Sequence, residues 1–259
     1  MSDVVMAEIR KDYLYHLVLK GERADGRAFD EYRKIVLETG PIRKADGSAL
    51  VKLGKTQVMV GVKIQPGAPF SDTPNKGVII TNAELVPLAS PNFEPGPPNE
   101  VGIELARVVD RGVRESGAID LESLCITPGE NVWIVFIDVH ILDDCGNLMD
   151  ASSLGAIAAL MTATVPAAQY GLGEDYLLPV KDVPVATTAV EFGDAVIFDP
   201  DTDEESVADT KLTVITTADG SVCGMQKSGP GFISQDHIYR IVDISCERAK
   251  EIREKFLEV

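Results

Sequence analysis

Cationic side chains are scarce in this sequence of 259 residues, in which 24 lysines and arginines stand against 41 aspartates and glutamates. The formal net charge is −17 at pH 7. Because phosphate contacts require cations, this balance excludes a protein that coats nucleic acid over its whole surface, and any such contact must be local. The chain is still 45% hydrophobic, so it has enough apolar side chains to fold rather than remain disordered.

Cysteine and histidine are also rare, at 4 and 3 residues. The cysteines are Cys125, Cys145, Cys223 and Cys246. They form no CxxC pair and have no Cys/His spacing typical of structural zinc. We interpret them as reduced core thiols, which indicates a cytoplasmic protein.

Long hydrophobic runs are absent. The longest apolar stretches, residues 132–142 and 154–168, are too short to span a bilayer. Residues 1–11 are charged and lack the apolar core of a signal peptide. We therefore expect no membrane partner. No P-loop, nucleophile elbow or dinucleotide fingerprint is present either, and we predict no cofactor.

The hydrophobic pattern predicts a mixed α/β architecture. We expect helices at residues 3–20, 99–115, 150–168 and 234–257. We expect strands within residues 49–64, 77–86, 131–142, 183–192, 194–199, 210–218 and 222–227, and an ordered loop over the proline-rich residues 87–98. The hairpin of residues 46–62 is echoed by that of residues 210–227, and each is followed later by a helix. This echo indicates a weak internal duplication.

An arginine stripe marks the predicted helix at residues 99–115. It consists of Arg107, Arg111 and Arg114. At about 100° per residue these side chains fall within roughly 60° of one another. Like charges at this spacing destabilise an isolated helix, so the stripe favours an anionic partner such as phosphate. The alternative is that Glu104, Asp110 and Glu115 neutralise the stripe in place.

The acidic segment at residues 199–205, DPDTDEE, begins like a calcium-binding loop. It lacks the rest of that motif, because Glu204 stands where the loop needs glycine and Thr210 where it needs a bidentate glutamate. We interpret the segment as a solvated turn after a strand. Magnesium binding or acid-base chemistry by paired carboxylates is the alternative.

Asp138 and His140 lie on one face of an apolar strand. They could form a metal site with Asp143 or Asp144, but we expect a satisfied core pair instead. We therefore predict no metal site.

Four segments together resemble the RNase PH family. They are GERADGRAFDEYRKI at residues 21–35, GSALVKLGKTQVMVGVK at 47–63, IELARVVDRGVRES at 103–116 and VWIVFIDVHILDDCGNLMDASSLGAIAAL at 132–160. The resemblance runs from about residue 8 to the C-terminus, and it is strongest to the non-catalytic members found in the archaeal exosome. It implies an α+β RNase PH fold, ribosomal protein S5 domain 2-like, built from duplicated hairpin and helix units. The expected domains are residues 1–180, with an N-terminal helical extension, and residues 181–259.

The resemblance also implies partners. Such a subunit forms a ring of three heterodimers with a catalytic RNase PH-like exosome subunit, and a trimer of S1-domain RNA-binding cap proteins sits on the ring. The ring degrades RNA from its 3′ end in a phosphorolysis that uses inorganic phosphate. The helix with the arginine stripe faces the heterodimer interface near the RNA path. This position implies sequence-independent RNA contacts by Arg107, Arg111 and Arg114.

Three departures from the active members predict a non-catalytic chain. Met149 stands where the arginine that grips the attacking phosphate is expected, and a thioether cannot hold a phosphate dianion. Asp199 matches the first of two catalytic aspartates, but Pro200 follows and Asp203 is the candidate for the second in a shortened loop. Residues 65–68, QPGA, replace a Gly-Pro-Arg loop. The rival hypotheses are an active homo-oligomeric phosphorolytic exoribonuclease and an acidic metal-binding module.

Overall fold

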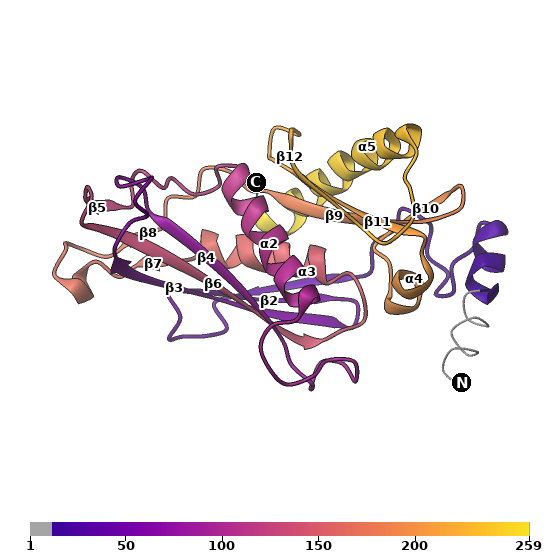
Figure 1. Ribbon diagram of the computed structural model, residues 1–259, viewed down its shortest axis with the longest axis horizontal. Coiled ribbons are helices and arrows are strands. Elements are labelled where there is room, and N and C mark those ends of the chain that lie inside the picture. The colour runs from indigo at the N-terminus through magenta and orange to yellow at the C-terminus, as the bar shows by residue number, and fades with distance from the viewer. Residues whose placement is uncertain (1–11, 259) are drawn as a thin grey trace.

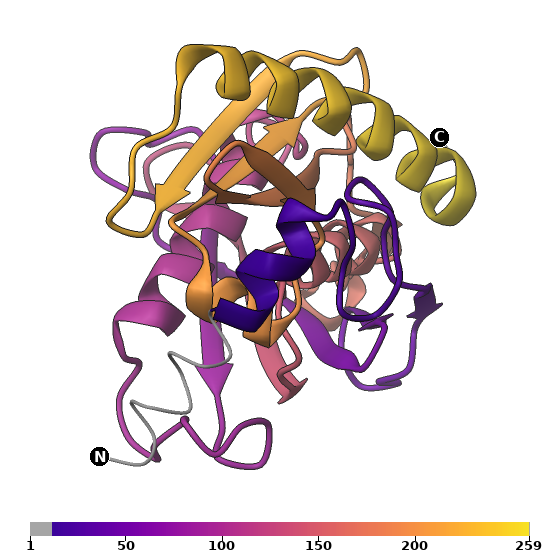
Figure 2. The same cartoon turned by 90° about the vertical axis from the view of Figure 1, so that its right-hand side faces the viewer.

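The computed structural model describes residues 12–258. Residues 12–19 are helical, and the first part of the helix expected at residues 3–20 lies outside the described residues. Figures 1 and 2 show two β-sheets with helices between them and a further helix against the outer face of the second sheet. No helix in this part of the chain is long and apolar enough to cross a membrane.

The first sheet has its strands in the spatial order β1 (Ile35–Thr39), β2 (Gly47–Leu53), β3 (Thr56–Gly67), β6 (Asn131–Asp143) and β4 (Val78–Leu85), with β5 (Cys125–Thr127) beside β6. All neighbours are antiparallel except β4, which runs parallel to β6. Along β3 and β6, buried and partly exposed residues alternate, because one face of the sheet packs on helices. Strand β3 continues to Gly67, beyond the expected strand end at residue 64.

The second sheet has the order β10 (Ala195–Phe198), β9 (Val185–Phe192), β11 (Thr210–Thr216) and β12 (Val222–Ser228), all antiparallel. Every residue of β9 is buried. Alternate residues of this strand pack in different clusters, Ala189 with Ile241 of helix α5 and Val190 with Leu14 of the N-terminal helix. Burial on both faces explains why β9 shows no hydrophobic alternation in the sequence.

Four helices complete the fold. They are α2 (Glu100–Glu115), α3 (Leu148–Met161), α4 (Thr202–Val207) and α5 (Gln235–Ile252), which continues into a π-helical turn at Arg253–Leu257. A short ribbon of β7 (Thr164–Val165) and β8 (Tyr176–Leu177), with a 3₁₀ turn at Ala168–Tyr170, lies in the connection between α3 and β9. The hairpins β2–β3 and β11–β12 confirm the expected mixed α/β fold with repeated hairpin and helix units. The boundary expected between residues 180 and 181 stays a prediction.

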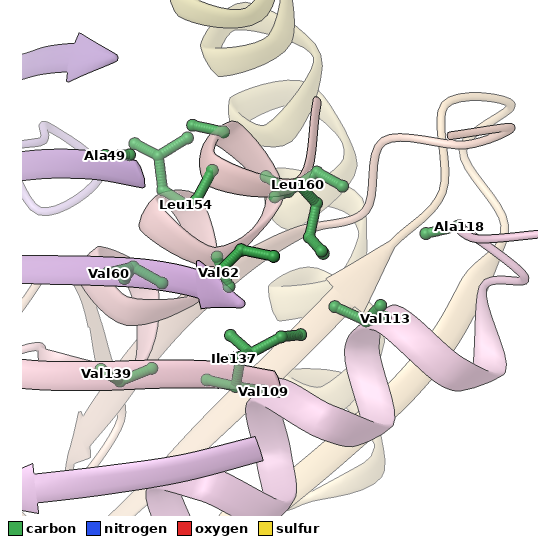
Figure 3. Packing of buried hydrophobic residues seen from close by; sticks show 14 of the residues in the cluster. Ala49, Val60, Val62, Val109, Val113, Ala118, Ile137, Val139, Leu154 and Leu160 are labelled. Atoms are coloured by element: carbon green, nitrogen blue, oxygen red, sulfur yellow. The ribbon is translucent and has the colours of Figure 1, made fainter. Parts of the chain in front are cut away.

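Helices α2 and α3 fill the space between the sheets, and Figure 3 shows their side chains directed toward β3 and β6. Small residues let α3 approach the strands closely, since a Cβ on Gly155 would lie 2.8 Å from Cγ2 of Val60. The helix expected at about residues 150–168 starts near the expected position, but its expected C-terminal end was wrong. It begins at an Asn147 cap and ends at Met161, because the β-branched Thr164 and Val165 pair with β8 and Pro166 follows.

Candidate functional site

The arginine stripe lies on α2, whose local sequence defines the helix well. The side chain of Asn99 caps it by accepting a hydrogen bond from the backbone N–H of Gly102 at 3.0 Å. Leu105, Val108, Val109 and Val113 are buried against the first sheet. The amphipathic pattern therefore orients α2 with its arginines away from the core.

Arg111 and Arg114 are both engaged within the chain. Nη1 of Arg111 donates to the backbone carbonyl of Met225 at 3.2 Å and to Oε1 of Gln226 at 3.1 Å, so it ties α2 to β12. Nε and Nη2 of Arg114 each donate to a carboxylate oxygen of Asp110 at 3.0 Å. Asp110 thus neutralises Arg114 in place, one of the outcomes considered from the sequence.

Glu104 forms no ion pair with the arginines of the stripe among the described residues. Its Oε1 accepts hydrogen bonds from Gln226 at 2.9 Å and from Ser228 at 2.6 Å, both on β12. Together with Arg111, this carboxylate fastens α2 to the edge strand of the second sheet. The stripe therefore consists of one arginine that joins the two sheets, one neutralised arginine, and Arg107.

Arg107 is exposed and makes no hydrogen bond or ion pair with any residue that the structure describes. It lines two grooves, one on either side of α2. The groove toward β4 has a volume of about 430 Å³, and the groove toward β12 one of about 290 Å³. A guanidinium without a protein partner beside open grooves is available to bind an anion.

The second cluster of functional candidates surrounds Asp199, which has no exposed surface. Nη2 and Nε of Arg33 donate to its two carboxylate oxygens at 2.7 and 2.9 Å. Nη1 of Arg27 donates to Oδ2 at 2.9 Å, and Nδ2 of Asn147 to Oδ1 at 2.8 Å. Burial by itself raises the pKa of Asp199, but the hydrogen bonds and charge of Arg33 together with Asn147 hold this pKa below its ordinary value.

The interpretation of residues 199–205 as a solvated turn was therefore wrong. Asp199 and Glu204 are 0% and 3% exposed, and Glu204 forms an ion pair at 2.7 Å with the buried Arg23. Asp201 and Glu204 form a capping box at the start of α4, so local hydrogen bonds organise the acidic run. Within residues 12–258, no group of three or more His, Cys, Asp or Glu side chains is arranged to hold a metal ion.

Asn147 connects Asp199 to a further buried carboxylate, Asp150, at the start of α3. One Nδ2 amide donates to both, at 2.8 Å each. Oδ2 of Asp150 also accepts from the hydroxyl of Tyr32 at 2.7 Å, and Oδ1 from the hydroxyl of Thr188 at 2.7 Å. Burial raises the pKa of Asp150 to about 6, although these hydrogen bonds act in the opposite direction. The cluster joins α3 to β9 of the second sheet and to the segment that precedes β1.

The acid that reaches the N-terminus of α3 is Glu205, not Asp203. Oε1 of Glu205 accepts from the backbone N–H of Asn147 at 3.3 Å and from Nζ of Lys211 at 3.2 Å. Burial raises the pKa of this carboxyl. Asp203, the candidate for a second catalytic aspartate, is exposed on α4 and does not belong to this cluster. Met149 is 6% exposed and belongs to the hydrophobic core.

The expected core pair of Asp138 and His140 was wrong. The ring of His140 is 43% exposed, and its Nδ1 lies 3.3 Å from Oε2 of the exposed Glu84. Asp138 accepts a hydrogen bond from Asn82 at 3.3 Å. Both side chains project from the outer face of the first sheet, where β6 residues alternate between core and solvent. The four cysteines are free thiols, but they are partly exposed rather than core residues.

Sequence reasoning missed Arg33, Asn147, Asp150 and Glu205. A signal for two of them was present, because Asn147 and Asp150 stand three residues apart directly before an apolar run, as at a helix N-terminus. No local signal could have found Arg33, whose partner Asp199 is 166 residues away.

Two parts of the chain match the description of one family. Residues 31–166 match "3′ exoribonuclease family, domain 1", and residues 182–248 match domain 2 of the same family. The two-sheet fold agrees with these matches, and the chain therefore belongs to the RNase PH family of 3′ exoribonucleases.

Its relatives within the family include archaeal proteins. The chain is 63% identical over 255 residues to "Exosome complex component Rrp42" of Methanocella arvoryzae, with 98% of each sequence covered. It is 56% identical over 259 residues to the protein of that name from Archaeoglobus fulgidus, with 100% of each covered.

Solved structures extend the likeness to three dimensions. A chain of the "archaeoglobus fulgidus exosome with RNA bound to the active site" is 57% identical with a TM-score of 0.95, covering 97% of this chain and 99% of that one. Rice Rrp46 reaches a TM-score of 0.70 at 19% identity, covering 91% of this chain and 100% of that one, which shows the fold alone.

Proposed function

We propose that this chain is a non-catalytic subunit of an archaeal exosome. In this proposal it forms a ring of three heterodimers with a catalytic RNase PH-like paralogue, and a trimer of S1-domain proteins caps the ring. It helps to shape the paralogue's active site and to hold RNA during phosphate-dependent 3′→5′ degradation and processing. Relatives named as exosome components, similar over 98 to 100% of their length, support this assembly. The cytoplasmic location expected from the sequence stays a prediction.

The observation that carries the non-catalytic role is the state of Asp199. Its carboxylate is fully buried and accepts hydrogen bonds from Arg27, Arg33 and Asn147, so it does not face a space where a substrate or metal could sit. An aspartate that supports a metal or transition-state charge must have a free lone pair directed at the reacting groups. The lone pairs of the Asp199 carboxylate are directed instead at Arg27 and Arg33 within the chain.

The N-terminus of α3 supports the same conclusion. Active family members grip phosphate with an arginine at the position that Met149 occupies at the start of this helix, and the side chain of Met149 lies in the core here. The amide of Asn147 donates to Glu205, and the neighbouring cation Lys211 is paired with the same carboxylate. An internal anion thus occupies donors that a phosphate dianion would need, and its charge repels a second anion.

The proposed contribution to RNA binding rests on α2. Arg107 is free to contact a phosphate, while Arg111 and Arg114 border the same 430 Å³ groove and add positive charge despite their internal partners. Guanidinium contacts to phosphate carry no base information, so this binding is independent of sequence. The net charge of −17 further indicates that the chain alone binds RNA poorly and that the partner completes the site.

Reconstitution tests the proposal. The chain alone and the chain mixed with its catalytic paralogue are examined by native mass spectrometry and by phosphate-dependent decay of a single-stranded RNA. We expect a 3:3 assembly that degrades RNA and no phosphorolysis by the chain alone. Robust phosphorolysis without the paralogue would instead establish the rival, an active homo-oligomeric exoribonuclease.

Substitution of Arg107 tests the RNA contact in the assembled ring. We expect Arg107→Ala to weaken binding of a fluorescent single-stranded RNA about three- to tenfold at moderate salt and to flatten the salt dependence, because one phosphate contact is lost. Arg240→Ala is the charge-matched control, since Arg240 is exposed on α5, beyond the second sheet. Equal affinities of the two variants would argue against an RNA contact at Arg107.

A further inference from the structure

The groove between α2 and β4 is more than a cationic surface. Its volume is about 430 Å³, within the range of small-ligand sites in proteins. Arg107 lies on its α2 side, beside Ile103 and Pro98, while Thr81 and Asn82 of β4 line the opposite side. Ile103 is 49% exposed and lines this groove as well as the one toward β12, so it offers an apolar contact beside Arg107.

Charge distinguishes this groove from the one on the other side of α2. The β4 groove has three arginines in its lining against the carboxylates of Asp110 and Glu115. The β12 groove has Arg107 and Arg111 against Glu100 and Glu104. Formal charges are therefore +1 (3 − 2) beside β4 and 0 (2 − 2) beside β12. A polyanion that contacts Arg107 is favoured on the β4 side.

We propose that the β4 groove is a nucleobase subsite for single-stranded RNA, with the base packed on Ile103 and Pro98 and its phosphate on Arg107. This inference rests on the proposed RNA-binding function and names the part of RNA that the site receives. An exposed apolar wall beside a free guanidinium suits a nucleotide, which joins a flat, weakly polar ring to an anionic group.

The subsite discriminates little between bases. The hydroxyl of Thr81 donates to Asp110, and the amide nitrogen of Asn82 lies 3.3 Å from Asp138, so the polar groups on the β4 side are largely engaged. Packing of a base on aliphatic side chains has no hydrogen-bond pattern to read. A sequence-independent degradation machine requires contacts of this kind.

Abasic RNA separates the base contact from the phosphate contact. The affinity of the reconstituted ring is measured by fluorescence anisotropy for a single-stranded RNA and for the same length of RNA with abasic sites. We expect Ile103→Ala to weaken binding of intact RNA about fivefold, as removal of a small apolar contact does, and to leave abasic binding unchanged. Arg107→Ala weakens binding of both RNAs equally.

Val101→Ala is the matched control, because Val101 is 52% exposed on the same helix and lines neither groove. Thermal unfolding checks that each variant folds. Equal effects of Ile103→Ala on intact and abasic RNA, or no effect on either, would overturn the base subsite while leaving the phosphate contact standing. A loss of ring assembly by Ile103→Ala would show that the groove binds protein instead. If Arg107→Ala changes neither affinity, the proposed RNA contact itself fails.

Discussion

The buried carboxylate of Asp199 provides the sharpest test of how this chain is held together. We predict that Asp199→Asn, which preserves the shape of the side chain, lowers the free energy of unfolding by about 3 kcal/mol at pH 7. Five hydrogen bonds converge on the carboxylate, three from Arg33 and one each from Arg27 and Asn147. An amide in its place turns an N–H toward donors, leaves Arg33 without its counterion and leaves Arg27 with the exposed Asp25 as its only carboxylate partner among the described residues.

The magnitude follows from burial. Breaking a buried ion pair by removing one partner costs about 3–5 kcal/mol. The low end applies because Arg33 and Arg27 are 12% and 10% exposed, and Arg33 keeps the carbonyl of Cys145 as an acceptor at 2.7 Å. For a chain of this size, a loss of 3 kcal/mol corresponds to a decrease in Tm of about 6–12 °C.

Urea unfolding followed through the fluorescence of the single Trp133, which is buried in the first sheet, measures the effect. Asp25→Asn is the control, because Asp25 also pairs with Arg27, at 2.6 Å, but its side chain is 39% exposed. A surface pair of this kind contributes less than about 1 kcal/mol. Equal losses for the two variants would refute the assignment of Asp199 as a buried charge that the fold depends on.

The same variant has a defined dependence on pH. Since the folded-state pKa of Asp199 is depressed, the carboxylate contributes stability that is fully present above its ordinary pKa of 3.8 and is lost as the pH falls through the lower folded-state value. The difference between wild type and Asp199→Asn should therefore be constant from pH 5 to pH 8 and shrink below about pH 4. A difference that grows on acidification would contradict this reasoning.

The remaining predictions concern α3. Burial raises the pKa of Asp150 to about 6, so the contribution of this carboxyl to stability decreases as the pH rises from about 4 to 6. Asp150→Asn should therefore be less destabilising at pH 7.5 than at pH 4.5. Urea unfolding at both pH values measures the difference. A larger penalty at pH 7.5 would show that the buried group is already a well-compensated anion. Gly155→Ala should lower the free energy of unfolding by about 1–3 kcal/mol, because the added Cβ would lie 2.8 Å from Cγ2 of Val60. Thermal unfolding measures this loss. A neutral or stabilising effect would mean that α3 can shift away from β3 at little cost.

Local sequence predicted the helix α2 and the face on which its arginines lie, but not what each arginine does. The Asn99 cap and the apolar face depend on residues within a few positions of one another. Arg114 pairs with Asp110 within one helical turn. Arg111, by contrast, donates to the backbone carbonyl of Met225, which is 114 residues away. Only the packing of α2 beside β12 leaves Arg107 as the arginine of the stripe without a partner among the described residues.

The sequence by itself determined the mixed α/β architecture and the resemblance that placed the chain in its family, because both depend on periodicity and on short strings of residues. The scarcity of cations remains a true statement about the surface as a whole. Tertiary structure decided which charges are buried and paired. Asp199, Glu204 and Glu205 read as a solvated acidic run, yet folding places Arg33, Arg23 and Lys211 beside them. The physical reason is that desolvation and pairing of a charge depend on elements brought together by folding. Arg23 and Arg33 stand 181 and 166 residues from their partners, a separation that no local pattern records.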